Sequence, residues 1–248
     1  MRKRWIVALS LLLMLSACGG EEAEVETPTT NLEYYEEVEK LEAKMYTLDS
    51  FKIRKTEDYE TLVCDGEGTK VKVANPNPAE YEVNKDGDDI AYRMVQKVED
   101  QIQYHTIYYK NKVFYQEFSQ MSGQVDTISG NNDALIMNTV FKEIDTNYYK
   151  VSKEEDGENT KYTFTLDKAK KYNEKYPDDR DSKSCNIVGD YVNQKFEITV
   201  NKDGYIIDER LEETIKYTSG ETVQERTNVV HYEFYDFNVP NEINFYFI

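Results

Sequence analysis

The chain has 248 residues, which is enough for one large domain or two small ones. Its 48 acidic and 30 basic side chains give a formal net charge of −18. Phosphate backbones repel such a chain, so a nucleic-acid partner is disfavoured. Two histidines and three scattered cysteines are too few for a polyhistidine metal site, a zinc knuckle or a Cys-x-x-Cys redox pair. We therefore expect no metal and no cofactor.

The N-terminus has the pattern of an export signal. Arg2, Lys3 and Arg4 form a positive patch, and residues 5–17 follow as an apolar run. This run is shorter than the about 20 apolar residues that a membrane-spanning helix needs. It therefore predicts a cleaved signal peptide over residues 1–17. Cleavage would remove three positive charges and no negative ones, which takes the net charge from −18 to −21.

The end of the signal, Leu15-Ser16-Ala17-Cys18, resembles the lipobox of bacterial lipoproteins. In that family the cysteine sulfur takes a diacylglyceryl group, and cleavage leaves this cysteine as the first residue. Two acyl chains, at about 0.8 kcal/mol per buried methylene, hold a protein on a membrane stably. The resemblance implies lipid attachment at Cys18 on the extracytoplasmic face of the cell membrane, as a surface or a periplasmic lipoprotein. The alternative is an ordinary secretory signal with a chance cysteine.

A flexible acidic tether is expected over residues 18–31, which are rich in glycine, glutamate and threonine. No second linker follows, so residues 32–248 are expected to form one domain. Its first element is an amphipathic helix over residues 32–48. Apolar side chains recur there at spacings of three and four residues: Leu32, Tyr35, Val38, Leu41, Met45 and Leu48.

Beyond residue 50, apolar and polar residues alternate in many segments that are rich in tyrosine, threonine, valine and isoleucine, as half-buried antiparallel strands do. We expect about eleven or twelve strands, with His105 and His231 among them. Two further helices are expected, over residues 131–144 and residues 167–176. Dipeptides ending in glycine predict tight turns between strands: Asp86-Gly87, Asp156-Gly157, Asp203-Gly204 and Ser219-Gly220.

Three local sequences carry a resemblance to LolA/LppX-type lipoproteins: residues 107–115 as a central hairpin, residues 200–206 as a late hairpin, and the ending Tyr235-Asp236-Phe237-Asn238-Val239-Pro240. The resemblance implies a mainly β (α+β) fold in which a curved, unclosed antiparallel sheet of about 11 strands wraps around an N-terminal helix and two inserted helices. It also implies a concave cavity able to take a hydrophobic or lipid ligand. We expect a monomer.

Alternatives stay open at this point. Side chains such as Tyr92, Met94, Tyr104, Phe196 and Ile198 either line that cavity or simply pack the core against the N-terminal helix, and core packing is favoured. A cell-wall or glycan-binding module with exposed tyrosines is the rival function, and an enzyme using paired carboxylates is the least favoured. No catalytic or ligand-lining residue is assigned.

Two further motifs are weighed. The segment Asn201-Lys202-Asp203-Gly204-Tyr205-Ile206 is similar to part of a calcium loop, but the two anchoring positions fall on Thr199 and Arg210, so a hairpin is predicted.

Cys64 and Cys185 remain after lipidation. A disulfide between them would close a loop of about 120 residues and stabilise the fold by about 4 to 5 kcal/mol. The sequence leaves the bonded and free states open.

The lipid anchor can be tested with a Cys18→Ala variant. Because the acyl chains attach to the thiol, this variant should no longer partition into detergent in phase separation, whereas the wild-type chain should. A variant that still sediments with membranes would contradict the anchor.

Overall fold

The computed structural model describes residues 29–243, apart from residues 59, 65–68, 74–76, 88, 99–100, 111–112, 119–125, 130–143 and 177–186. The predicted signal peptide and lipobox with Cys18 lie outside the described residues. So do Cys185, the side chain of Cys64, and the expected helix over residues 131–144 apart from Ile144, which is not helical. No helix within the described ranges is both long and apolar enough to cross a membrane.

The N-terminal helix α1 spans Thr29–Met45 and begins ahead of the expected Leu32. Asn31 lies in its first turn, where its Nδ2 donates to the Tyr149 carbonyl at 2.8 Å and its Oδ1 accepts from the Val151 amide at 3.2 Å. These bonds attach the start of α1 to the sheet. Two of its side chains, Val38 and Met45, are buried in the core.

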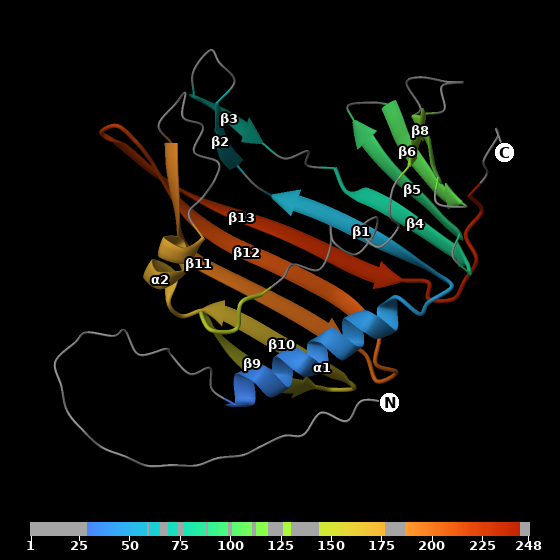
Figure 1. Ribbon diagram of the computed structural model, residues 1–248, viewed down its shortest axis with the longest axis horizontal. Coiled ribbons are helices and arrows are strands. Elements are labelled where there is room, and N and C mark those ends of the chain that lie inside the picture. Colours follow the sequence, from blue (N-terminus) through green and yellow to red (C-terminus); the bar gives the residue numbers. More distant parts are fainter. Residues whose placement is uncertain are drawn as a thin grey trace, which may run out of the picture.

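One antiparallel sheet of eleven strands dominates the molecule, which confirms the expected mainly β, unclosed fold (Figure 1). The order across it is β8-β7-β6-β5-β4-β1-β13-β12-β11-β10-β9. The strands are β1 (Ser50–Asp58), β4 (Ala79–Asp86), β5 (Asp89–Val98), β6 (Gln101–Lys110), β7 (Val113–Phe118), β8 (Asp126–Ser129), β9 (Tyr149–Asp156), β10 (Asn159–Leu166), β11 (Ile187–Val200), β12 (Ile206–Ser219) and β13 (Thr222–Tyr235).

Among the described residues, three smaller elements lie outside this sheet. Strands β2 (Glu60–Cys64) and β3 (Thr69–Val73) form a separate hairpin. Helix α2 spans Ala169–Lys175 and confirms the helix expected over residues 167–176. The hairpin of β6 and β7 is also confirmed, but it lies near one edge of the sheet rather than at its centre, because β1 pairs with β4 and β13 and thereby takes the middle position.

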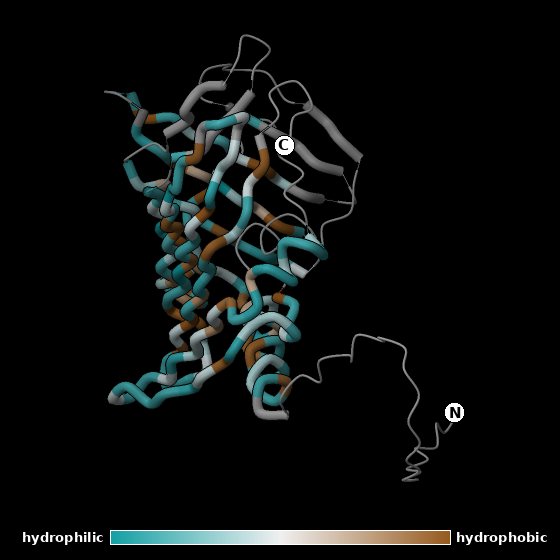
Figure 2. The backbone as a smooth tube through the Cα atoms, turned by 90° about the vertical axis from the view of Figure 1, so that its left-hand side faces the viewer, coloured by the Kyte–Doolittle hydropathy of each residue, from teal (hydrophilic) through white to brown (hydrophobic). Residues whose placement is uncertain are grey.

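The sheet is strongly curved, and α1 lies on its concave face (Figures 1 and 2). Hydrophobic and hydrophilic residues alternate along the strands in Figure 2, as one buried face requires. Strand β10 is an example, with Tyr162, Phe164 and Leu166 buried and the threonines between them half-buried.

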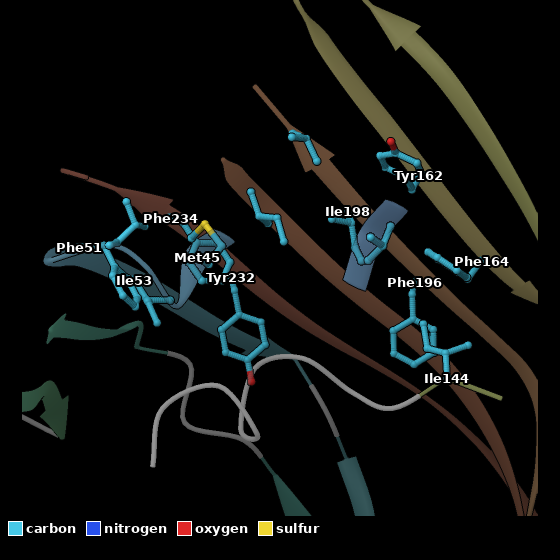
Figure 3. Close-up of a cluster of buried hydrophobic side chains, with 14 of the residues drawn as sticks. Met45, Phe51, Ile53, Ile144, Tyr162, Phe164, Phe196, Ile198, Tyr232 and Phe234 are labelled. Carbon is cyan, nitrogen blue, oxygen red and sulfur yellow. The ribbon is translucent and has the colours of Figure 1, made fainter. Parts of the chain in front are cut away.

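The core fills the space between α1 and the concave face (Figure 3). Phe196 and Ile198 are buried there and Tyr92 packs against the cluster, which confirms core packing for these three residues. Met94 and Tyr104 are half-buried. The buried members are Val38, Met45, Leu48, Phe51, Ile53, Val83, Ile144, Tyr149, Tyr162, Phe164, Leu166, Phe196, Ile198, Val200, Ile206, Tyr232 and Phe234.

The expected glycine turns are present, and all four glycines have positive φ angles. Gly204, with φ +74°, lies in the hairpin between β11 and β12, where an added Cβ would stand 3.0 Å from the Lys44 Nζ of α1. The Asn201 Oδ1 accepts from the Asp203 and Tyr205 amides at 3.1 and 2.9 Å, so this segment is a side-chain-stabilised turn as predicted.

The C-terminal Asp-Phe-Asn sequence has a structural role. Asn238 adopts φ +56°, donates its amide to the Ser50 carbonyl at 2.8 Å and accepts from the Asp49 amide at 3.1 Å. Phe237 stacks on Tyr205 with ring centroids 5.1 Å apart. These contacts tie the end of β13 to the start of β1 and to the turn that contacts α1.

Truncation of the core should be costly. Phe51 is 0 % exposed, so Phe51→Ala should lower the free energy of unfolding by about 3 to 5 kcal/mol through lost burial and a residual cavity. Ile102→Ala, at a 71 % exposed position, should change it by less than about 0.5 kcal/mol. Urea denaturation measures both, and similar midpoint shifts would contradict this placement of the core.

Candidate functional site

The concave face changes character along the central strands. At the α1 end, Ile53 of β1 lies opposite Phe234 of β13, and both are buried. Two residues further along β1, Lys55 lies opposite Tyr232. The same face therefore changes, within two positions along β1, from two apolar side chains to a lysine beside a tyrosine. Figure 3 shows the apolar part, with Met45 near Phe234.

A pocket of about 200 Å³ lies in this mixed region, between β1, β4 and β5. We call it the β1–β4–β5 pocket. The strand register places Lys55, Ala79 and Gln96 side by side, and Tyr81 beside Met94. Its lining thus combines apolar surface with two amides and an ion pair, and consists of Lys55, Glu57, Asn77, Ala79, Tyr81, Met94 and Gln96.

The tyrosines around this pocket are held in their neutral form. Burial raises the pKa of Tyr81, and the charge of Glu57 adds to the shift. Burial raises the pKa of Tyr92 and Tyr232 as well. The Tyr81 and Tyr92 rings lie 5.5 Å apart, and the Lys55 Nζ lies 5.6 Å from the centre of the Tyr232 ring. Of these tyrosines, Tyr81 lines the pocket, so the pocket offers one aromatic ring beside an ion pair, a combination that suits an amphipathic molecule.

A second feature of the concave face is a row of polar residues from five strands, which we call the polar row: Tyr149, Gln194, Glu213, Asn228 and Glu60. The Tyr149 hydroxyl donates to the Gln194 side chain. The Gln194 Nε2 donates to Glu213 at 3.1 Å, and the Asn228 Oδ1 accepts from the Glu60 amide at 3.2 Å. Gln194 is 0 % exposed, so these bonds satisfy groups that water cannot reach.

A third candidate lies around α2. A pocket of about 400 Å³, which we call the α2 pocket, is lined by Ala169, Lys170, Asn173, Glu174, Asp190 and Tyr191. Next to it, the rings of Tyr148, Tyr149, Tyr172, Tyr176 and Tyr191 form a chain of edge-to-face and tilted contacts. Tyr176 is 40 % exposed. Tyr149 is buried and the other three tyrosines are half-buried, so Tyr176 is the exposed member of the cluster.

The remaining residues singled out from the sequence do not meet at one site. His231 lies on the convex face, where its Nε2 pairs with the Asp208 Oδ2 at 2.5 Å, and His105 lies on β6 opposite Met94. Within the described ranges, no group of three or more His, Cys, Asp or Glu side chains could hold a metal ion.

The sequence analysis missed the polar row, the buried carboxyl group of Glu209 and the half-buried carboxyl group of Glu42. A signal for each carboxyl was present. Glu42 lies four residues after Val38, on the apolar side of the helix, and Glu209 alternates in phase with the inward-facing Leu211. The signal for the polar row was weaker, because its members come from five separate strands.

No family model matches the chain, and no curated protein matches it either.

The polar row can be tested by Gln194→Met. Removing the amide leaves the Tyr149 hydroxyl and the Glu213 carboxylate without this partner in a buried place, so the free energy of unfolding should fall by about 1 to 3 kcal/mol. Gln101→Met, at an exposed position of β6, should change it by less than about 0.5 kcal/mol. Equal stabilities of the two variants in urea would contradict a buried, bonded Gln194.

Proposed function

We propose that this chain is a non-enzymatic lipoprotein, held by lipid on Cys18 at the extracytoplasmic face of the cell membrane, that binds a hydrophobic or amphipathic molecule on its concave face. The observation that carries the binding role is the β1–β4–β5 pocket, which opens where the concave face is no longer covered by the core. The signal and lipobox pattern supports the anchor, and the curved open sheet agrees with the LolA/LppX resemblance.

The size and lining of the pocket favour an elongated ligand. Sites that enclose a whole drug-sized ligand have volumes of about 300 to 1,000 Å³. A volume of about 200 Å³ is smaller, so the pocket suits one end of a longer molecule. Ala79, Tyr81 and Met94 would contact apolar groups. The Lys55–Glu57 ion pair and Gln96 would bind a polar end through hydrogen bonds.

A second candidate function is glycan binding at the α2 pocket. The specific observation in its favour is an exposed tyrosine, Tyr176, in a cluster beside a pocket that also presents Asp190 and Glu174. Aromatic rings stack on sugar faces, and carboxylates accept hydrogen bonds from sugar hydroxyls. This candidate ranks second because the Asn173 side chain is already bonded to the Tyr191 backbone, at 2.9 and 3.0 Å, and so has a structural role.

Ligand binding can be tested with the purified full chain and the fluorescent apolar probe N-phenyl-1-naphthylamine. The wild-type chain should bind the probe, and a long-chain fatty acid should displace it. Met94→Glu places a charge against the apolar wall of the pocket, so the probe affinity should fall at least about tenfold, which corresponds to 1.4 kcal/mol. Native mass spectrometry of protein from its own membranes should show a co-purifying lipid.

A matched control comes from the next residue of the same strand. Val95→Glu introduces the same charge on the opposite face of β5, so it should leave the probe affinity within about twofold of wild type. Equal loss in both variants, or no probe binding by a folded wild-type chain, would contradict the proposal. Retention on insoluble cell-wall glycan without probe binding would favour the second candidate instead.

A further inference from the structure

Two carboxyl groups, one on α1 and one on β12, lie in the region where α1 packs on the sheet. Glu209 lies on β12, where its side chain is 4 % exposed and its Oε2 has no hydrogen-bond partner among the described residues. Glu42 lies on α1 between Val38 and Met45, both of which are buried in the core. Glu42 is itself half-buried, so the docked helix holds both carboxyl groups partly or wholly out of water.

Among the described residues, no cationic side chain pairs with either carboxyl group. Opposite Glu209 in the register are Ile198 of β11 and Tyr232 of β13. Among the described residues, the charges that shift the pKa of the two carboxyl groups are all acidic: Glu39 acts on Glu42, and Glu42 and Asp208 act on Glu209.

The nearby cations are engaged elsewhere. Lys55 pairs with Glu57, although it also lies over the Tyr232 ring. Lys44 of α1 donates to the Asp203 carbonyl. His231 pairs with Asp208 on the convex face. A buried carboxylate with no cationic partner is costly, so the protonated form of the pair is the one that fits the docked helix.

The pKa shifts agree with this geometry. Burial raises the pKa of Glu42 to about 7, with a contribution from Glu39. Burial raises the pKa of Glu209 well above its usual range, and the charges of Glu42 and Asp208 add to the shift. When α1 leaves the sheet, both groups return to water and to a pKa near the ordinary value of about 4.3. The undocked form thus releases protons that the docked form retains.

We propose that the Glu42–Glu209 pair makes the docking of α1 on the concave face dependent on protons, so that α1 is held firmly at mildly acidic pH and loosens as the pH rises. The sign follows from linkage. Between the ordinary pKa and the raised one, the docked form binds more protons than the undocked form, and rising pH therefore favours undocking. This inference goes beyond ligand binding and does not depend on it.

Another carboxyl group of α1 acts with the opposite sign at lower pH. Glu37 accepts hydrogen bonds from Lys153 and Tyr162, at 2.7 Å each, and these bonds lower its pKa. Its contribution to docking is present above the ordinary pKa and is lost as the pH falls below it. A pH range from 5.5 to 7.5, above the ordinary carboxyl values of about 4.3, separates the effect of the Glu42–Glu209 pair from that of Glu37.

The test is hydrogen exchange of the α1 amides in the full chain at several pH values, with rates corrected for the intrinsic pH dependence of exchange. The opening constant is the equilibrium constant for undocking of α1. For each proton that the docked form binds and the undocked form releases, it rises by up to about tenfold per pH unit. The opening constant of α1 should therefore increase at least about tenfold between pH 5.5 and 7.5. In the E42Q/E209Q double variant, whose amides mimic the protonated groups, it should change by less than about twofold.

Three further variants keep the test decisive. E36Q removes the same charge from an exposed position of α1 and should retain the wild-type pH dependence. E42Q alone should reduce that dependence, which provides a readout if the double variant does not fold. A flat wild-type profile, an unchanged profile in E42Q, or a dependence that is lost only in H231Q would overturn the proposal. None of these readouts involves a ligand.

Discussion

The docking of α1 on the concave face is the interaction on which the rest of the structure depends. An antiparallel sheet with one apolar face must bury that face, and α1 contributes Val38 and Met45 to the cluster that does so. The contacts of α1 reach both ends of the core: Asn31 bonds to β9, and Lys44 bonds to the turn between β11 and β12. The helix therefore helps to fix the positions of β9, β11 and β12, and α2 packs against the same cluster through Ala169 and Tyr172.

The same interface contains polar groups whose effects oppose one another. Glu37 is stabilised as a carboxylate by Lys153 and Tyr162, in a partly exposed position at the rim. Glu209 lies deeper, where hydrocarbon and other acids surround it, and docking favours its neutral form. Burial thus decides which carboxyl groups favour docking as anions and which favour it as acids. An apolar residue in place of Glu209 would pack there without the cost of burying a carboxyl group. Glu209 therefore reduces the stability of the docked form above the ordinary carboxyl pKa.

Much of the local structure could be predicted from the sequence, because it depends on neighbouring residues. The alternation of apolar and polar residues predicted the strands, and the dipeptides ending in glycine predicted turns such as the one at Gly204. The order of the strands could not be predicted, since β1 and β13 pair across most of the chain. For the same reason, the candidate pocket could not be placed: Lys55, Ala79 and Gln96 meet only through the register of three strands. Glu42 and Glu209 occupy positions of the sequence pattern where apolar residues are expected. That both lie in the same interface could not be predicted without the fold.

The packing of the core limits how a ligand can bind. Beneath α1 the concave face is filled by side chains such as Met45, Phe51 and Phe196, so an apolar chain can reach this area only by displacing the helix. Displacement would expose side chains that each contribute about 1.5 to 3 kcal/mol through burial. Binding in the β1–β4–β5 pocket exposes none of them and is therefore the route of lower free energy. Ionisation of Glu42 and Glu209 lowers the free-energy cost of displacing α1. The pH therefore determines how much less favourable helix displacement is than binding in the pocket.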